Sequence, residues 1–204
     1  ALASSGYAVL QHNYRGSTRY GETFLAAGNG AWGGKCLSDI SDGVADLVAH
    51  GIVDAKRVAI LGSGAYAGYA ALASVSVKPG PYNCAIAVGA ISDMQLYRQT
   101  SIGNENSPGY RYFRKLVGAQ TDLDSLSPAQ HAGNVNVPVL LIHSEEETGV
   151  DIQQSRKMAG ALKSAGKPVD FPEFKAEDNW GLVEKSRIEF ITYVIDFLAK
   201  HNPA

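Results

Sequence analysis

A serine at the end of a predicted strand is the side chain of this sequence best placed to act as a nucleophile. Ser63 stands between Gly62 and Gly64, directly after the apolar run Val58–Leu61. A sharp turn between a strand and a helix is the arrangement that exposes a serine hydroxyl for acyl transfer, provided that a base accepts its proton. A serine between two glycines is also ordinary turn chemistry, and we favour that interpretation of Ser63.

A second group of polar residues follows the apolar run Pro138–Ile142. His143 is followed by Glu145, Glu146 and Glu147, a set that could form a displaced base or a metal site. A divalent cation needs further oxygen ligands that the sequence does not identify, so we predict a structural histidine, a solvated acidic turn and no metal or other cofactor. The two cysteines, Cys36 and Cys84, have no metal-binding spacing and are predicted to be buried thiols.

The elements that position these residues alternate between strand and helix. Apolar runs predict strands at residues 7–10, 57–61, 84–89, 138–143 and 169–174. Helical spacing predicts helices at 37–50, 68–76, 151–165 and 186–201, the last with an apolar stripe of Ile188, Ile191, Ile195 and Leu198. This alternation predicts a mostly parallel sheet, on which functional residues gather at the carboxyl ends of the strands.

The bulk composition indicates one compact domain over residues 1–204 and excludes two classes of partner. Hydrophobic residues make up 45% of the chain and charged residues 19%, which is typical of a globular protein. A net charge of -2 with scattered basic residues argues against nucleic acid. The sequence contains no apolar run of membrane-spanning length and no signal peptide, so we expect a soluble chain, with a cytoplasmic location favoured.

The segment Arg57–Leu72 reads Arg-Val-Ala-Ile-Leu-Gly-Ser-Gly-Ala-Tyr-Ala-Gly-Tyr-Ala-Ala-Leu. It resembles the nucleophile elbow of the prolyl oligopeptidase family, whose pattern is G-x-S-x-G-G-Y. Aligned from the helix side through Tyr69, the family's serine position is Ala65; aligned from the strand side through Gly62, it is Gly64. Neither residue has a hydroxyl, and the two alignments imply an insertion of one residue in the turn.

Two further segments resemble the same family. Residues 137–150 match its P-V-L-L-I-H-G-x-x-D-x-x-V-P pattern and place Glu147 on the catalytic aspartate. Residues 176–180 match its last catalytic loop and place Asn179 on the histidine that acts as general base. A glutamate can orient a histidine, whereas an amide cannot accept and return the serine proton. The resemblance therefore implies a triad that has lost its nucleophile and its base.

The resemblance covers nearly all of the chain and implies an α/β-hydrolase fold with a mostly parallel sheet flanked by helices. The resemblance implies an earlier strand and a glycine-rich oxyanion loop in family members, and we expect residues 1–204 to lack both. We therefore expect an amino-terminally incomplete domain with a gap between the strand near residues 7–13 and the strand at 58–61. A missing amino-terminal segment or another chain is expected to complete the sheet, because unpaired strand edges are costly when buried.

Two hypotheses for function remain open. The favoured one is a non-catalytic homologue or inactive fragment with a binding or structural role, whose ligand would be a peptide or a small acyl compound. The alternative is a serine peptidase or esterase, similar to acylaminoacyl or dipeptidyl peptidases, that is disabled in this form or uses Ser63 as a displaced nucleophile. Four aromatic residues could line a remnant of the substrate pocket, although core packing explains them equally well: Tyr14, Tyr66, Tyr69 and Trp180.

Overall fold

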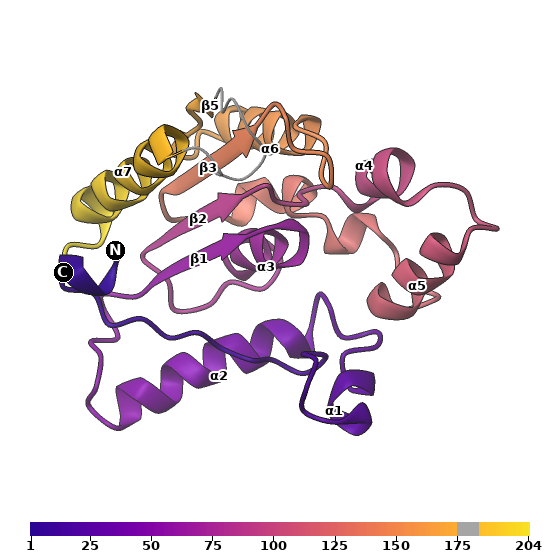
Figure 1. The fold of residues 1–204 in the computed structure, drawn as a ribbon, viewed down its shortest axis with the longest axis horizontal. Helices are drawn as coiled ribbons and strands as arrows, with labels where there is room; N and C mark the ends of the chain where they lie inside the picture. The colour runs from indigo at the N-terminus through magenta and orange to yellow at the C-terminus, as the bar shows by residue number, and fades with distance from the viewer. Residues whose placement is uncertain (175–183) are drawn as a thin grey trace.

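The structure, a computed structural model, describes residues 1–174 and 184–204. Helices and strands alternate along the chain after an irregular amino-terminal stretch (Figure 1). The helices are α1 (Glu22–Ala26), α2 (Lys35–Ala49), α3 (Ala65–Ser76), α4 (Met94–Tyr97), α5 (Pro108–Val117), α6 (Gln153–Ser164) and α7 (Glu184–His201). The strands are β1 (Ala59–Ser63), β2 (Cys84–Val88), β3 (Val139–Ser144), β4 (Val169–Asp170) and β5 (Glu173–Phe174).

The strands form a parallel sheet in the order β1-β2-β3-β4, and β5 pairs with β3 beyond β4. Ala59 of β1 is in register with Cys84 of β2, and Ala85 of β2 with Val139 of β3. The described strands thus pair only in parallel, which confirms the predicted sheet. At its opposite edge, β1 has no neighbouring strand among the described residues.

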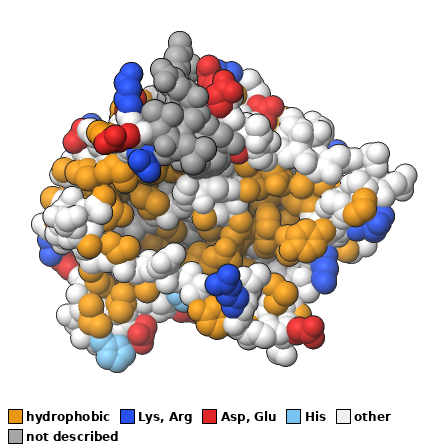
Figure 2. Space-filling view, viewed as in Figure 1, with side chains coloured by type: hydrophobic (Ala, Val, Ile, Leu, Met, Phe, Trp, Pro, Cys, Tyr) orange, Lys and Arg blue, Asp and Glu red, His pale blue; other side chains and the backbone are white. Residues whose placement is uncertain are grey.

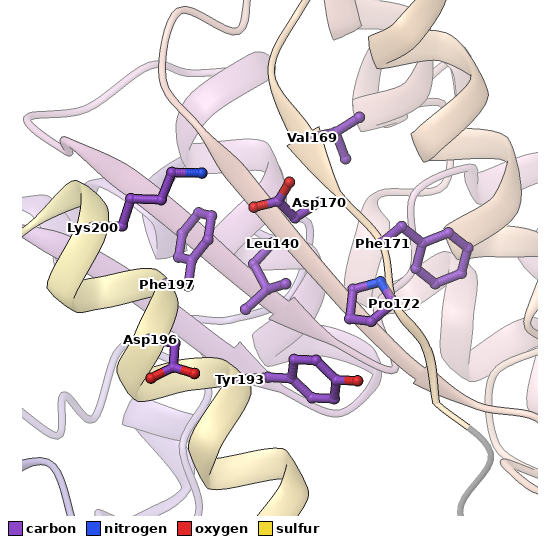
Figure 3. Close-up of a pocket in the computed structure, with 9 residues that line it drawn as sticks. All are labelled: Leu140, Val169, Asp170, Phe171, Pro172, Tyr193, Asp196, Phe197 and Lys200. Atoms are coloured by element: carbon purple, nitrogen blue, oxygen red, sulfur yellow. The ribbon is translucent and has the colours of Figure 1, made fainter.

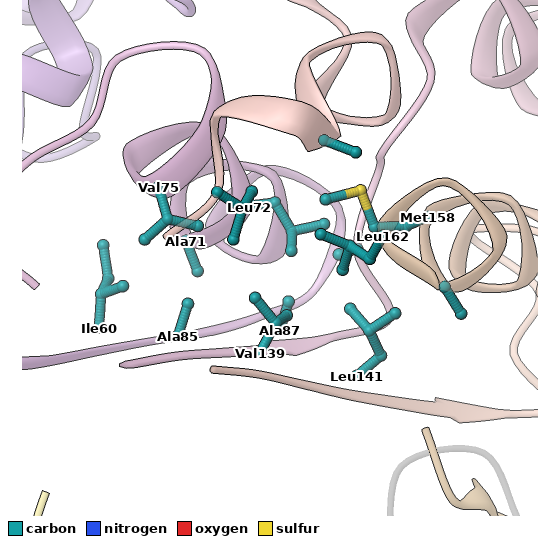
Figure 4. Close-up of a cluster of buried hydrophobic side chains, with 14 of the residues drawn as sticks. Ile60, Ala71, Leu72, Val75, Ala85, Ala87, Val139, Leu141, Met158 and Leu162 are labelled. Atoms are coloured by element: carbon teal, nitrogen blue, oxygen red, sulfur yellow. The ribbon is translucent and has the colours of Figure 1, made fainter. Parts of the chain in front are cut away.

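Helices cover both faces of the central strands. On one face, α3 and α6 pack on β1, β2 and β3, where Leu72, Leu141 and Leu162 form part of a buried cluster (Figure 4). On the other face, α7 packs on β2 and β3 through Val194, Phe197 and Leu198. Both faces of β2 and β3 are buried, and their sequences are accordingly near-continuous apolar runs. Among the described residues no helix is long and apolar enough to cross a membrane.

The first predicted strand is not a strand in the structure. Residues 7–14 run as an extended trace along α2, and from Ala8 to Asn13 no backbone group forms a hydrogen bond with a described residue. The prediction of a strand at Tyr7–Leu10 is therefore wrong, although the segment is extended. A ladder requires a partner at about 4.8 Å, and no described strand lies in that position.

Two predictions near the carboxyl end also need correction. The strand expected at residues 169–174 is split into β4 and β5, because Pro172 has no N–H with which to continue the ladder. The buried face of α7 contains Val194, Phe197 and Leu198, whereas Ile188 of the predicted stripe is 60% exposed. Leu198 of the same stripe is buried, and Ile191 and Ile195 are half-buried, so the predicted stripe coincides in part with the packed face of α7.

Candidate functional site

The turn between β1 and α3 is the centre of the candidate site. β1 ends at Ser63, Gly64 has φ 94° and ψ 174°, and α3 begins at Ala65. A positive φ is the strained conformation that a nucleophile elbow imposes on its central residue. The structure therefore puts the sharpest point of the turn at Gly64, the strand-side candidate, and makes Ala65 the first helical residue. Neither residue offers a hydroxyl or thiol.

Close approach of β1 to α3 explains the two glycines that flank this turn. A Cβ on Gly62 would lie 1.8 Å from the backbone oxygen of Ala67, and a Cβ on Gly68 would lie 2.6 Å from Cβ of Ala90. Only hydrogen fits at either position. This is the packing that the glycines of a nucleophile elbow provide.

Ser63 lies beside the turn without a base. Its residue is exposed, and its hydroxyl forms no hydrogen bond with any part of the described chain. His143, the histidine of the motif loops, uses both ring nitrogens elsewhere. Its Nδ1 is 2.8 Å from Oγ of Ser155, and its Nε2 is 2.8 Å from the carbonyl oxygen of Val150. Nothing in the described residues therefore prepares Ser63 for proton removal.

His143 holds the acidic turn in place. The ring is 1% exposed, and burial lowers its pKa below the ordinary value of 6.5. A neutral ring fits its partners, because Nε2–H can donate to the Val150 carbonyl while Nδ1 accepts from the Ser155 hydroxyl. This agrees with the predicted structural role. The bond to Val150 closes the turn that carries Glu147.

Glu147 lies in the turn after β3. Because the strands are parallel, this turn is at the carboxyl ends of the strands, as the β1–α3 turn is. Its Oε1 accepts a hydrogen bond of 2.6 Å from the backbone N–H of Gly149, and its buried Oε2 has no partner within the described part of the chain. The side chain borders a polar hollow of about 280 Å³ lined by Thr100, Ser101, Glu145, Glu147, Thr148, Asp151 and Ile152.

Across residues 1–174 and 184–204, no cluster of His, Cys, Asp and Glu is suited to hold a metal ion. Asn179 and Trp180, the remaining predicted site residues on this side, lie outside the described residues.

The predicted aromatic residues form a packed cluster. The ring of Tyr66 lies 5.1 Å from that of Tyr14 and 5.7 Å from that of Tyr69, measured between centroids. Tyr69 is 0% exposed, so it packs in the core and does not line an open pocket. The Tyr66 hydroxyl donates to the carbonyl oxygen of Trp32, and burial raises its pKa. Tyr14 and Tyr66 keep partial exposure next to the turn.

The loop after β2 is fixed by a residue that the sequence motifs did not single out. Gln154 is fully buried, and its Oε1 accepts hydrogen bonds from the backbone N–H groups of Ser92 (2.9 Å) and Asp93 (2.8 Å). Asp93, also buried, caps α4 and forms an ion pair of 2.5 Å with Lys157. A polar residue at a helix start carries no sequence signal that distinguishes a buried clamp from a surface side chain.

The cysteines are not nucleophiles. Both are free and buried, as predicted. Burial raises the pKa of the Cys36 thiol and raises that of Cys84 to about 11, so both stay protonated near neutrality.

A second hollow, larger than the one beside Glu147, lies away from this site. It has a volume of about 430 Å³ and lies between α7 and the β4 edge of the sheet, where Tyr193 and Phe197 of α7 line it together with Leu140 and residues 169–172 (Figure 3). Because β4 is at the other end of the strand order from β1, this groove is remote from the β1–α3 turn. It contains none of the predicted site residues.

Comparisons with known proteins agree with this architecture. The dipeptidyl aminopeptidase BIII of Pseudoxanthomonas mexicana is 29% identical over 204 residues, which cover 98% of this chain and 30% of that protein. The dipeptidyl peptidase family member 6 of Caenorhabditis elegans is 33% identical over 181 residues, covering 83% of this chain and 24% of that one. The chain thus spans less than a third of the length of these relatives.

Solved structures show the same fold. A puromycin-hydrolyzing peptidase of Mycobacterium tuberculosis superposes with a TM-score of 0.84 and 26% identity, over 93% of this chain and 29% of that one. The acylaminoacyl peptidase of Pyrococcus horikoshii gives a TM-score of 0.81 and 25% identity, over 93% and 31%. The described sheet and its helices are therefore part of an α/β-hydrolase fold.

The profile of the prolyl oligopeptidase family matches residues 1–203, almost the whole chain. With the elbow backbone of β1 and α3 and the acidic turn after β3, the match shows that this chain belongs to the prolyl oligopeptidase family.

Proposed function

We propose that this chain is a non-catalytic member of its family with a binding or structural role. The observation that carries the proposal is the β1–α3 turn, where Gly64 takes the strained central conformation and Ala65 starts the helix. An elbow without a hydroxyl or thiol cannot form the acyl-enzyme intermediate on which serine hydrolases depend. The ligand in such a role is a peptide or a small acyl compound, the class bound by an intact site of this kind.

The base position supports the same proposal. Asn179 replaces the family's histidine, and an amide has no pKa near neutrality with which to accept and return a proton. His143 cannot act as the base instead, because its two ring nitrogens are hydrogen-bonded to Ser155 and Val150. Loss of either the nucleophile or the base costs about 10⁶ in turnover, and the two losses do not add because the residues act as a unit.

Labelling with a fluorophosphonate probe tests the proposal. We expect no adduct on this chain by mass spectrometry under conditions that label dipeptidyl aminopeptidase BIII stoichiometrically. A stoichiometric adduct on any serine would refute the non-catalytic role.

Ser63 is the residue through which the alternative function would operate. It is exposed at the carboxyl end of β1, one position before Gly64, which favours access to a substrate. A serine peptidase or esterase that uses this hydroxyl would be labelled at Ser63, and Ser63→Ala would abolish the adduct. Labelling that survives in Ser63→Ala would exclude this alternative.

Restoring a hydroxyl alone is not expected to restore chemistry. Ala65→Ser and Gly64→Ser should both remain unlabelled, because no described base lies beside the turn. Each variant is compared with a form that also carries Asn179→His and Glu147→Asp. Rapid labelling of either single variant would show that a base already serves the turn and would contradict the proposed loss of function.

A further inference from the structure

The groove between α7 and β4 combines an apolar floor with charged residues at its rim. Its volume of about 430 Å³ lies within the range of pockets that bind small molecules. The apolar part of the lining comes from β3, α7 and the chain around β4: Leu140, Val169, Phe171, Pro172, Tyr193 and Phe197. Three charged residues complete the lining: Asp170, Asp196 and Lys200. We call this space the α7–β4 groove.

The two ends of the α7–β4 groove differ in character. Figure 3 shows Lys200 and Asp170 at one end, and Tyr193 and Pro172 at the other. At about 1.5 Å per helical residue, residues 193–200 span about 10 Å, and the extended chain at 169–172 spans about the same length. The groove therefore has a charged end and an apolar end about 10 Å apart.

The register of β4 turns Asp170 toward the groove. Leu140 of β3 is in register with Asp170, and residues paired side by side in a sheet have their side chains on the same face. Leu140 packs on the α7 cluster, so Asp170 also lies on the α7 face. A charge on the inner face of an edge strand opposes the addition of another strand, and Pro172 cannot donate to a ladder. The edge of β4 is therefore protected against strand pairing, which favours a small ligand as the occupant of the groove.

Lys200 and Asp170 lie at the same end of the groove without bonding to each other. Neither forms an ion pair with any residue that the structure describes, so Nζ and the carboxylate oxygens are more than 4.0 Å apart. Charged side chains of both signs also lie next to hydrophobic ones over the region of α7 (Figure 2). An ammonium and a carboxylate held apart in this way are complementary to a ligand group that has both charges. Asp196, one helical turn from Lys200, makes the lining negative overall and disfavours a ligand that has only a carboxylate.

We propose that the α7–β4 groove binds a free amino acid with a large apolar side chain. The ammonium group of the ligand pairs with Asp170 and its carboxylate pairs with Lys200. Its side chain lies along Phe197 toward the apolar end, where contact with aromatic rings removes it from water. The site lies at the opposite end of the strand order from the β1–α3 turn, so the proposal goes beyond the catalytic status of the chain and is independent of it.

An NMR titration of the 204-residue chain with L-phenylalanine tests the proposal. We expect saturable shifts of the backbone amides at residues 169–172 and 193–200, with a dissociation constant in the millimolar range that is usual for a ligand of this size. Three matched compounds separate the parts of the ligand. 2-Phenylethylamine lacks the carboxylate, 3-phenylpropanoate lacks the ammonium group and glycine lacks the apolar side chain. Each is expected to bind at least about tenfold more weakly than L-phenylalanine.

Variants of the chain locate the charged end of the site. Lys200→Met keeps the apolar stem without the charge, and Asp170→Asn keeps the shape of the carboxylate. Each is expected to weaken binding of L-phenylalanine at least about tenfold. Lys163→Met, at an exposed position of α6 on the other face of the sheet, is the control and should bind unchanged. Unaltered amide shifts in β2 and β3 show that each variant is folded.

Several outcomes would overturn the proposal. One is the lack of any saturable shift, and another is binding of glycine, 2-phenylethylamine or 3-phenylpropanoate as tight as that of L-phenylalanine. Unchanged binding in both Lys200→Met and Asp170→Asn, or ligand shifts confined to residues 62–66, would place the ligand elsewhere. Groove shifts that follow protein concentration without ligand would identify a second copy of the chain as the occupant. None of these outcomes depends on whether a fluorophosphonate adduct forms.

Discussion

At the scale of single residues, Gly64 and His143 account for most of what the candidate site can and cannot do. Gly64 occupies the one strained backbone position of the turn and has no side chain. His143 keeps its place at the end of β3, but its ring is a buried brace between Ser155 and Val150. A polar residue in a motif loop is therefore not a catalytic candidate until its hydrogen-bond partners are known.

The buried ring of His143 predicts a pH dependence of stability. Burial lowers its pKa below 6.5 in the folded chain, so the unfolded chain takes up a proton at higher pH than the folded chain does. Its stabilising contribution is complete above about pH 6.5 and is lost as the pH falls through the lowered pKa. Between pH 7.5 and 5.5, urea unfolding should show a loss of at most about 1.4 kcal/mol from this group.

The matched variant for this prediction is His143→Gln, which keeps a donor and an acceptor but does not titrate. Its stability should change less between the two pH values than that of the unsubstituted chain. Equal pH dependence in the two proteins would assign the effect to other groups.

At the scale of elements, the contact between β1 and α3 holds the backbone of the elbow in place. β1 extends to Ser63, which is in register with Val88 of β2. The extra residue that the two sequence alignments imply is thus accommodated between the end of β1 and the start of α3. The helix then begins directly after Gly64. The strand and helix are held together by the absence of side chains at Gly62 and Gly68, which lets the two backbones touch.

Two glycine substitutions of opposite sign test this contact. Gly62→Ala places a Cβ 1.8 Å from a backbone oxygen that cannot move without shifting α3, and should destabilise the fold by about 3 kcal/mol or more. Gly160→Ala, at an exposed position of α6 with no atom near the new Cβ, should stabilise it by about 0.5–1 kcal/mol. Chemical denaturation measures both; a neutral Gly62→Ala would show that α3 is not fixed against β1.

A buried clamp joins α6 to the loop after β2. Gln154→Leu removes the acceptor for two buried N–H groups, those of Ser92 and Asp93, and should cost about 2–4 kcal/mol in unfolding free energy. Gln153→Leu, at the preceding and exposed position of the same helix, is the control and should change the unfolding free energy by less than about 0.5 kcal/mol. Similar losses in the two variants would indicate a general effect at the start of α6.

At the scale of the whole molecule, burial is greatest in the middle of the sheet and least at the β1 edge. β2 and β3 are covered on both faces, whereas β1 has an open edge and an exposed Leu61. The extended segment beside it has no ladder. Residues 8–13 and the free edge of β1 therefore both have backbone groups without a hydrogen-bond partner in the described chain.

Hydrogen exchange of the chain alone should follow this gradient. Amides of β2 and β3 are expected to exchange slowest, at rates set by global unfolding, while residues 8–13 should exchange within about tenfold of the rate of an unstructured peptide. Amide-resolved measurement on dilute protein is the check. Strong protection of residues 8–13 under those conditions would mean that the segment already has a partner.

The sequence by itself determined the parallel sheet, the central strands and the lack of a hydroxyl at Gly64 and Ala65. Continuous apolar runs such as Val139–Ile142 predict buried strands because their composition depends on burial of both faces, a property local to each run. Absence of a hydroxyl from Gly64 and Ala65 is a matter of residue identity and needs no coordinates. The family resemblance carried by the same motifs was confirmed.

Only the tertiary structure decided which apolar segments have partners. Tyr7–Leu10 has a strand pattern but no ladder. Ile188 is exposed although Leu198 of the same predicted stripe is buried. Both outcomes depend on neighbours distant in sequence. The tertiary structure also decided that Gly64 and not Ala65 is the centre of the turn, and that Tyr69 lies in the core. It likewise showed that Gln154 holds the loop after β2 by buried hydrogen bonds. Strand pairing, backbone strain and buried hydrogen bonds are relations between segments, and a pattern within one segment does not contain them.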